Sequence, residues 1–299
     1  MTDRHSCDVC GSSNSIPIDS LSSYIDGREI DVCKKCGFVF VSSRRNYKEI
    51  AESWSDRIFA NGQNKPTTGE VYTAVRPAIR ARLIQILETI DQEIGVEGAS
   101  ICDIGAGEGV FLNYASTLKN TGEIFGVEPS KVNCELLTEL GIPNFSGTIE
   151  EFISASGEEL PQFDIVVIQW TLECCASPRE MLQSVWKLLR PGGHVVIGTG
   201  SRILVPFKKP LQFYVGPGEQ DTHAFRFSAK SLRNMLRLTG FLPTFTNRYI
   251  DNDVLCVIAE KKSSPSLPDL EIDDYREVLS FFDRWHLDSK KYYSNWIDT

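Results

Sequence analysis

Apolar positions at helical spacing mark the chain between residues 46 and 95, which we expect to be mostly helix. Within it, EVYTAVRPAIRARLIQILETI places apolar side chains three and four residues apart: Ile79, Leu83, Ile86, Leu87 and Ile90. Pro77 suits the first turn of such a helix, because that turn needs no backbone donor at this position. The preceding NGQNKPTTG has the composition of a loop.

From about residue 98 the pattern changes to short apolar runs that alternate with amphipathic stretches. The runs typical of strands are SICDIG, EIFGVEPS, PNFSG, FDIVVIQW and GGHVVIGTG. The stretches typical of helices are VFLNYASTLK, KVNCELLTELG, TIEEFIS, PREMLQSVWKLLR and SAKSLRNMLRLTG. The last two strands, FLPTFTNRYI and VLCVIAEK, follow one another across a short DND turn and predict an antiparallel hairpin.

This alternation predicts an α/β fold with a doubly wound, Rossmann-like sheet. The uninterrupted apolar run FDIVVIQW indicates a strand covered on both faces, as in a parallel sheet. The closing hairpin makes the last strand antiparallel, whereas a plain dinucleotide-binding domain would continue with strand and helix units. In such sheets ligands bind at the carboxyl ends of the strands.

Composition narrows the class of protein. Of the 299 residues 41% are hydrophobic and 24% charged, which is ordinary for a globular protein. No apolar run reaches the length of a membrane span, and the N-terminus lacks the apolar core of a signal peptide, so we expect a cytoplasmic protein. The net charge of −9 disfavours nucleic acid as the partner, because such binders carry a basic surplus.

Four of the nine cysteines form two CxxC pairs near the N-terminus: Cys7, Cys10, Cys33 and Cys36. Zinc prefers four tetrahedral ligands, and each CxxC turn presents two sulfurs to one metal ion. The spacing predicts a zinc ribbon whose closed site is structural, because four thiolates leave no position for substrate. The other five cysteines stand in apolar or mixed surroundings and are expected to be small buried side chains: Cys102, Cys134, Cys174, Cys175 and Cys256.

These patterns divide the chain into four parts. We expect a zinc ribbon over residues 1–45, a helical connector over 46–97, the catalytic α/β domain over 98–262 and an aromatic-rich helical tail over 263–299. Residues 201–227 form an insert far longer than an ordinary connection, which predicts a lid or substrate wall.

The glycine-rich loop after the first strand, ICDIGAGEGVFL, predicts a nucleotide cofactor. Its glycines follow a G-x-G-x-G spacing, with Val110 where the dinucleotide fingerprint has its third glycine. Glu128 ends the second strand, where an acid accepts hydrogen bonds from ribose hydroxyls. Together they favour an adenosine-type ligand over a pyrophosphate.

Over residues 98–260 the chain resembles the class I S-adenosylmethionine-dependent methyltransferases. ICDIGAGEGVFL is similar to their first motif, IFGVEPS to their second-strand acid and SGTIEEF to their adenine-flanking turn. FDIVVIQWTLECCASPREMLQSVWKLLRPGGHVVIGT resembles their block from the fourth to the fifth strand. One departure is Cys174, which stands where many relatives have histidine after Leu-Glu.

The resemblance implies a cofactor site for S-adenosylmethionine. Asp103, Gly105, Ala106 and Gly107 would surround its methionine end, and Glu128 with Pro129 would hold the ribose. Thr148 and Ile149 would flank the adenine, and Gln169 and Trp170 would line the cofactor at the fourth strand end.

The chemistry of methyl transfer to a hydroxyl or an acidic carbon requires a base, and histidine is the usual one near neutral pH. His223 stands just before a predicted helix, near the end of the long insert, and is the candidate catalytic base; its alternative role is to cap the helix or pack in the lid. Other insert residues are candidate substrate contacts: Arg202, Lys208 and Lys209 for phosphate, and Phe213 and Tyr214 for a ring. Tyr72 and Arg76 are further candidates before the first strand.

The zinc ribbon, the methyltransferase core and the histidine before FRFS together resemble the methyltransferases of deoxysugar and surface-polysaccharide pathways. The resemblance implies a sugar or nucleotide-sugar acceptor, methylated on oxygen or carbon. Two alternatives stay open: an RNA methyltransferase that uses a locally basic ribbon, and a zinc-ribbon interaction protein with an inactive fold. The basic residues of the ribbon are Arg4, Arg28, Lys34, Lys35, Arg44 and Arg45.

The aromatic-rich tail, as a helix, would bury Val278, Phe281, Phe282 and Trp285. Docking on its own chain is the first expectation for that apolar face. A homodimer contact is the second.

Overall fold

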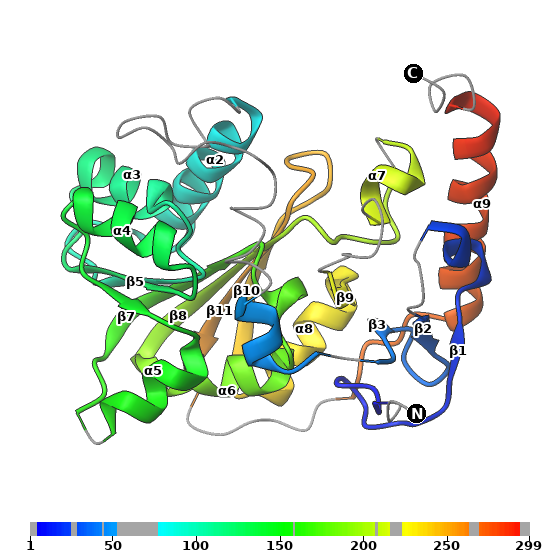
Figure 1. Cartoon of the computed structure of the whole chain (residues 1–299), viewed down its shortest axis with the longest axis horizontal. Helices are drawn as coiled ribbons and strands as arrows, with labels where there is room; N and C mark the ends of the chain where they lie inside the picture. Colours follow the sequence, from blue (N-terminus) through cyan, green and yellow to red (C-terminus); the bar gives the residue numbers. More distant parts are fainter. Residues whose placement is uncertain are drawn as a thin grey trace.

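A seven-stranded sheet forms the centre of the molecule in the computed structural model, which describes residues 5–24, 29–43, 45–52, 77–157, 159–206, 209–215, 223–262 and 269–293. Its strands lie in the order β10-β11-β8-β7-β4-β5-β6 (Figure 1). Their bounds are β4 (Ile101–Ile104), β5 (Ile124–Glu128), β6 (Asn144–Ser146), β7 (Phe163–Gln169), β8 (Leu189–Thr199), β10 (Phe241–Thr246) and β11 (Leu255–Lys261).

All neighbours from β8 to β6 pair in parallel, and β11 pairs antiparallel with both β8 and β10. The predicted Rossmann-like sheet and its antiparallel last strand are therefore confirmed. Since β11 is inserted between β8 and β10, the carboxyl end of β10 and the amino end of β11 lie at the same edge as the carboxyl ends of the other strands.

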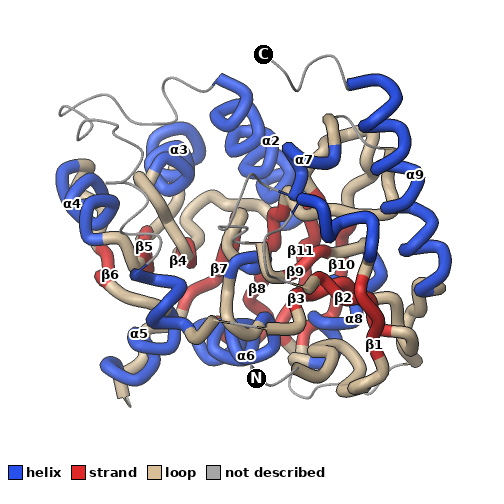
Figure 2. The backbone as a smooth tube through the Cα atoms, turned by 45° about the vertical axis from the view of Figure 1, so that its right-hand side comes forward, coloured by secondary structure: helices blue, strands red, loops and turns tan. Residues whose placement is uncertain are grey.

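Helices cover both faces of this sheet (Figures 1 and 2). One face packs against α2 (Pro77–Ile94), α3 (Val110–Lys119) and α4 (Lys131–Glu139). The other packs against α5 (Ile149–Ser156), α6 (Pro178–Leu188) and α8 (Ala229–Leu238). Because helices cover both faces of the sheet, the strand sequences are apolar throughout and do not alternate between apolar and polar residues.

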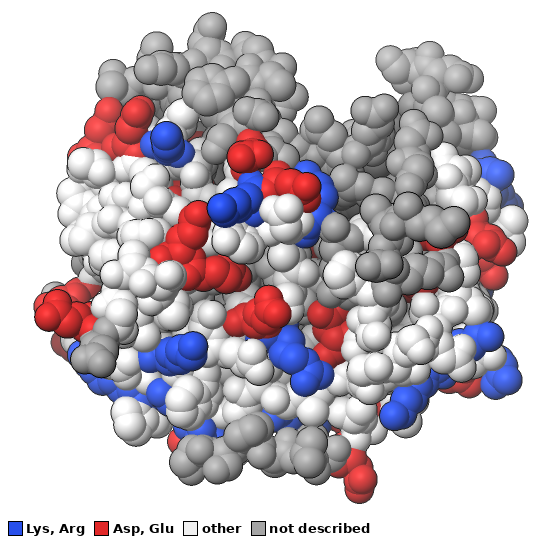
Figure 3. Space-filling model, turned by 60° about the horizontal axis from the view of Figure 1, so that its bottom comes forward, with Lys and Arg blue, Asp and Glu red and all other residues white. Residues whose placement is uncertain are grey.

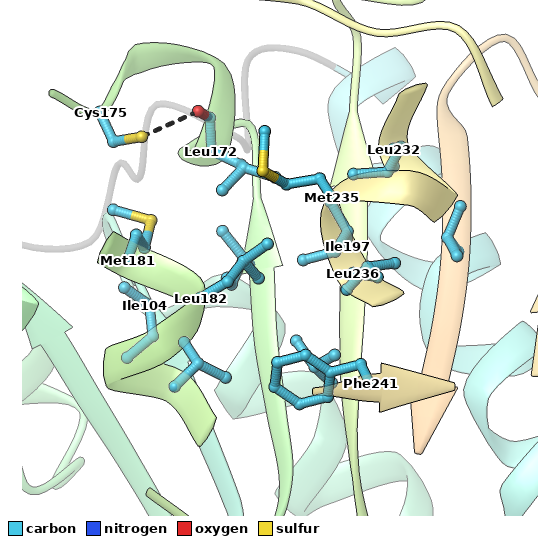
Figure 4. Packing of buried hydrophobic residues seen from close by; sticks show 14 of the residues in the cluster. Ile104, Leu172, Cys175, Met181, Leu182, Ile197, Leu232, Met235, Leu236 and Phe241 are labelled. Atoms are coloured by element: carbon cyan, nitrogen blue, oxygen red, sulfur yellow. Dashed lines mark hydrogen bonds between the residues drawn. The ribbon is translucent and has the colours of Figure 1, made fainter. Parts of the chain in front are cut away.

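Successive strand residues separate into the two cores. In β7, Val166 and Ile168 join the core beneath α6 and α8, whereas Ile165 and Val167 join the core beneath α2 and α3. Figure 4 shows the first of these cores, where the labelled side chains of α6 and α8 meet those of the strands. Burying this much apolar surface supplies the main driving force for the fold.

Capping residues fix the helix starts as the sequence indicates. Pro77 begins α2, as expected of a first-turn proline. The side chains of Ser177 and Ser228 accept hydrogen bonds from backbone amides at the start of α6 and α8. Residues 47–52 are also helical, and the remainder of the predicted connector before Pro77 lies outside the described residues.

A second, smaller body is built from three distant segments. A four-stranded sheet joins β1 (Ser15–Pro17), β2 (Ile30–Cys33) and β3 (Val39–Val41) of the N-terminal part to β9 (Phe225–Arg226) of the insert. The short helices η1 (Asp19–Tyr24) and α7 (Leu211–Val215) and the tail helix α9 (Tyr275–Tyr293) pack on it. The N-terminal part and the insert, predicted as separate units, therefore share one sheet.

The tail helix α9 runs along this body (Figures 1 and 2). The four side chains predicted to be buried are at most 8% exposed, and they share a core with β2, β3 and α7. Trp285 Nε1 also donates to the carbonyl of Lys209, at 2.9 Å. The tail thus docks on its own chain. Among the helices of the described residues, none combines the length and the apolarity needed to cross a bilayer.

Candidate active site

The candidate site lies where four neighbouring strands end. Gly105 follows β4, Glu128 ends β5, Gln169 ends β7 and Thr199 ends β8. Because these strands are parallel neighbours, their carboxyl ends meet at one edge of the sheet. The sequence-predicted cofactor residues on these strands are therefore brought together.

The glycine loop requires glycine for two separate reasons. Gly105, Gly107 and Gly109 have φ angles of 76°, 53° and 76°, in the left-handed region that favours glycine. A Cβ atom at Gly105 would lie 2.2 Å from the hydroxyl oxygen of Thr171, so the loop also leaves no space for a side chain there. Among the described residues, no heavy atom outside Gly107 and its chain neighbours lies within 4 Å of a Cβ built on Gly107, so the backbone there has space for a ligand.

Glu128 ties the glycine loop to the second strand. Its carboxylate accepts hydrogen bonds from the backbone N–H groups of Gly107 and Ser130, each at 2.8 Å. The side chain is buried, and burial raises its pKa, although these two bonds oppose the shift. The acid is thus held beside the loop with a fixed orientation.

Asp103 and Gln169, both buried at this edge, have polar atoms without partners in the described part of the chain. Asp103 Oδ1 and both amide atoms of Gln169 make no hydrogen bond there. Burial, together with the charge of Glu128, raises the pKa of Asp103 to about 8. Buried polar atoms without partners cost free energy, so they are expected where a ligand completes the site.

The other sequence-predicted cofactor residues have varied surroundings. Thr148 caps α5 through a reciprocal pair of hydrogen bonds with Glu151. Ile149 is 1% exposed in the core, Ala106 is buried and Pro129 is half-buried. Trp170 is in the left-handed region at φ 52°, unusual for a bulky residue, and its N–H donates to the carbonyl of Gly198 at 2.7 Å.

Glu173 lies in the short helix η2 (Leu172–Cys174), directly after the fourth strand of the methyltransferase pattern. It is fully buried, and burial raises its pKa to about 7. Oε1 accepts from the N–H of Gly200 at 3.2 Å, and Oε2 meets no hydrogen-bond geometry with any described residue, although the nearby Thr199 hydroxyl opposes the rise in pKa. Cys174 and Cys175 are buried like the other isolated cysteines, which confirms that expectation.

His223 is brought to the same edge by the closure of the insert. Phe227 N–H donates to the Ser201 carbonyl at 2.8 Å, and Ile203 N–H donates to the Phe227 carbonyl at 3.0 Å. These bonds join the two ends of the insert just beyond β8. His223 Nδ1 consequently lies 2.6 Å from Ser201 Oγ. Ser201 and Thr171 are site residues that the sequence analysis missed, because their partners are distant along the chain.

The candidate substrate residues are only partly assembled. Tyr214 is 8% exposed and its ring lies 4.6 Å from that of Trp285, so it belongs to the core of the second body. Phe213, its neighbour on α7, is 61% exposed. Tyr72, Arg76 and Lys208 lie outside the described residues.

The four N-terminal cysteines converge on one point. Their sulfur atoms all lie within 4.8 Å of one another, and the closest pairs are 3.5 Å apart. Four sulfurs bound to zinc at about 2.3 Å would be about 3.8 Å apart, so this cluster has suitable dimensions. Gly11 follows the first CxxC pair and Gly37 follows the second, both with φ near 70°. Their N–H groups donate to the carbonyls of Cys7 and Cys33, respectively.

The cysteine cluster is attached to the large domain on two sides. Arg179 of α6 donates to the carbonyls of Asp8 and Val9 in the first CxxC turn. In the second turn, the Cys36 carbonyl accepts from the N–H of Asp273 at 3.3 Å. Asp273 also accepts from the hydroxyl of Ser228, the residue that caps α8.

The strand order, the glycine loop and the acid at the next strand end define a class I S-adenosylmethionine-dependent methyltransferase. A family described as a methyltransferase domain matches residues 74–243, more than half of the chain. The chain belongs to this methyltransferase family.

Curated relatives share this domain at moderate identity. The chain is 28% identical over 186 residues to the ubiquinone biosynthesis O-methyltransferase of Proteus mirabilis, covering 61% of this chain and 64% of that protein. It is 29% identical over 163 residues to the ubiquinone/menaquinone biosynthesis C-methyltransferase UbiE of Pasteurella multocida, covering 48% and 59%. These matches span less than two thirds of either relative.

Solved structures show the same fold. One is the 1,6-didemethyltoxoflavin-N1-methyltransferase of Burkholderia thailandensis with bound S-adenosylhomocysteine, at a TM-score of 0.52 and 16% identity over 84% of this chain and 100% of that one. Another is the magnesium protoporphyrin IX methyltransferase of Synechocystis PCC 6803 with bound cofactor, at 0.50 and 12% over 74% and 99%.

Proposed function

We propose that this protein transfers the methyl group of S-adenosylmethionine to a sugar or nucleotide-sugar, with His223 as general base. The observation that carries the proposal is the 2.6 Å contact between His223 Nδ1 and Ser201 Oγ, which holds a histidine beside the cofactor edge of the sheet. The methyl sulfonium provides the electrophile but cannot remove the acceptor's proton, and a histidine at this position can do so.

The cofactor, when bound, supplies an electrophilic methyl group on a positively charged sulfur. Asp103, Glu128 and Gln169 are the chain's own side chains for holding it, because each is buried at the edge that the glycine loop leaves open. The unpartnered oxygen of Asp103 suits the cofactor's ammonium group, and Glu128 suits the ribose hydroxyls. Ala106, Pro129, Thr148, Ile149 and Trp170 complete the proposed site.

The contact with Ser201 engages Nδ1 of His223 and leaves Nε2 as the candidate base in this proposal. For Nε2 to accept a proton, Nδ1 must carry the ring hydrogen and donate it to Ser201 Oγ. The Ser201 hydroxyl can accept that hydrogen, so the contact is compatible with the tautomer that a base requires. The remaining parts of the machinery position the acceptor and exclude water.

The sugar acceptor is supported by the combination of a four-cysteine unit, a methyltransferase domain and a histidine before FRFS. Residues 201–227 then serve as the substrate wall, and the second body carries it through β9. The names of the curated relatives favour a second candidate, a hydroxylated aromatic ring such as a quinone precursor.

The four-cysteine cluster holds a structural zinc ion in this proposal. Cys7, Cys33 and Cys36 are at most 2% exposed, and four sulfur ligands leave no open coordination position. Its role is to fold the N-terminal ribbon, residues 1–45, which is too small to build a sufficient core alone.

Calorimetry and turnover measurements test the proposal in sequence. S-adenosylhomocysteine should bind, and an absence of binding at millimolar concentration would reject the cofactor assignment. His223→Ala should lower turnover about 10²-fold, the contribution of a general base, while the affinity for S-adenosylhomocysteine stays unchanged. His194→Ala, in the middle of β8 and away from its carboxyl end, is the matched control. Turnover within about threefold of wild type for both variants would reject the base.

An acceptor panel separates the competing substrates. Nucleotide-sugars, a catechol and an RNA fragment are offered to the same enzyme with labelled cofactor, and methylation of the nucleotide-sugars alone is the expected result. On the face shown in Figure 3, basic and acidic side chains are interspersed, which does not favour RNA. Labelling of RNA that weakens with salt would instead support the RNA alternative.

A further inference from the structure

Arg202 is a buried cation that the proposed chemistry does not use. It lies directly after Ser201 and is 8% exposed. Its Nη2 donates to the carbonyl of Asn247 at 3.4 Å, and its guanidinium carbon lies 5.5 Å from the centre of the Tyr249 ring. Its Nη1 is buried and has no hydrogen-bond partner among the described residues. A guanidinium group with an unpaired buried donor is costly unless an anion completes it.

Lys209 is linked to Arg202 through Tyr214. Its ammonium group is 5.8 Å from the centre of the Tyr214 ring, and the Tyr214 hydroxyl donates to the Arg202 carbonyl at 3.3 Å. The residue keeps more than a third of its surface exposed, and no ion pair is formed by it within the described part of the chain. Crowding by protein atoms and repulsion by Arg82 lower its pKa.

Charged groups of both signs lie near Lys209. Arg82 of α2 pairs with Asp253, at 2.7 Å, and the charge of Asp253 also favours the protonated form of Lys209, so one carboxylate faces two cations there. Within the described residues, neither Arg202 nor Lys209 forms an ion pair with a carboxylate. Arg202 lies at the edge where β8 and β10 end, since it follows β8 and donates to Asn247, which follows β10.

We propose that Arg202 and Lys209 form a subsite for a phosphoryl group of the acceptor. Arg202 follows Ser201, which contacts His223, so a phosphoryl group held there brings the rest of the acceptor beside the base. Arg presents two donors to phosphate oxygens, and Lys adds a mobile charge. The inference rests on the proposed function and sharpens it to a phosphorylated acceptor such as a nucleotide-sugar.

Binding of inorganic pyrophosphate to the protein saturated with S-adenosylhomocysteine tests the subsite without any methyl transfer. Calorimetry should show saturable binding to wild type, weakened about ten- to a hundredfold in Arg202→Met and in Lys209→Met, because each loses a charge-assisted contact. Arg202→Lys, which keeps the charge in the buried position, should recover part of the affinity. Lys187→Met, an exposed lysine on α6, is the matched control and should bind as wild type does.

Several outcomes would overturn the subsite. They are no binding to wild type, equal affinity in Lys209→Met and wild type, or tighter binding of malonate, a dicarboxylate, than of pyrophosphate. If Arg202→Met does not fold, the comparison of Lys209→Met with Lys187→Met still decides. Pyrophosphate binding without methylation of any sugar would reject the sugar acceptor and keep the subsite, whereas methylation of an uncharged sugar without pyrophosphate binding would reject the subsite alone.

Discussion

Asp103, Glu128 and Glu173 are acidic side chains buried within one edge of the sheet, and burial raises the pKa of each. A protein core does not accept such groups without compensation, because ionising a carboxyl group away from water is costly. A ligand with a positively charged sulfur and an ammonium group supplies that compensation. We therefore interpret the buried acids as groups whose negative charge complements the positive charges of the cofactor.

Glu173 should make stability fall as pH rises from about 4.5 to 7. Below this window the carboxyl group is protonated in both folded and unfolded chains; within it, only the unfolded chain ionises, so stability is lost until the folded-state pKa of about 7 is passed. The loss is about 3.5 kcal/mol at most, at about 1.4 kcal/mol per pKa unit. Glu173→Gln has no carboxyl group to ionise and should not lose this stability. The free energy of unfolding by urea, taken relative to wild type, should therefore be higher at pH 8 than at pH 5.

Exposed Glu135 on α4 provides the control for that measurement. Glu135→Gln removes one negative charge without emptying a buried position. If Glu173→Gln and Glu135→Gln keep the same stability relative to wild type at pH 5 and pH 8, burial of Glu173 does not govern this pH dependence.

Glu128→Gln should weaken S-adenosylhomocysteine binding about tenfold or more. The substitution replaces a carboxylate that accepts from Gly107 and Ser130 by an amide with a single oxygen, and it removes the charge that would accept from ribose hydroxyls. Titration calorimetry of wild type, Glu128→Gln and Glu135→Gln gives the comparison. Equal affinities in all three would show that Glu128 takes no part in cofactor binding.

At the scale of elements, local patterns predicted the large sheet well because its strands and helices are continuous in sequence. The glycines after β4, the acid that ends β5 and the closing hairpin lie where they were expected. The strand β9 was not predicted, since it has only two residues and its partner β3 precedes it by more than 180 residues. The contact between Ser201 and His223 was not predicted either, because it forms only where the two ends of the insert meet.

The loop after β4 should tolerate no side chain at Gly105. Gly105→Ala places a methyl group against Thr171 in addition to the left-handed strain, so both stability and cofactor binding should fall. Gly95→Ala is the matched control, because Gly95 has a φ of 74° but nothing within 4 Å of its Cβ. That variant should lose only about 1 kcal/mol from strain. Similar unfolding midpoints for the two variants would show that the contact with Thr171 is not limiting.

At the scale of the whole molecule, the second body connects parts that the sequence separates. The N-terminal strands, the insert and the tail helix bury one another's apolar side chains, so none of them needs a large core of its own. Arg179 and Asp273 add polar attachments between the cysteine cluster and the large domain. The position of His223 therefore depends on a unit whose own folding we attribute to a metal ion.

Removal of that metal should impair methyl transfer and leave cofactor binding intact. Backbone pairing joins β3 to the segment just after His223: Phe40 lies opposite Phe225, and Val41 N–H donates to the Ala224 carbonyl at 2.8 Å. The strand β3 itself begins three residues after Cys36. Without metal the N-terminal unit should unfold, because coordination supplies about 10 kcal/mol or more of folding free energy in such units.

Chelation of the protein, or Cys33→Ser, should therefore abolish zinc in elemental analysis and lower turnover at least about tenfold, while S-adenosylhomocysteine still binds within about threefold of wild type. Amide exchange of Phe225 and Arg226 should accelerate in the same samples, because the strand that pairs with them is lost. Cys256→Ala, which removes a buried cysteine outside the cluster, is the control and should keep zinc and slow exchange.

Unchanged turnover after loss of zinc would mean that the N-terminal unit does not hold His223 in place. Loss of cofactor affinity together with turnover would mean that the two bodies fold as a single unit, since the sheet edge that carries Glu128 and Asp103 would then depend on the metal as well.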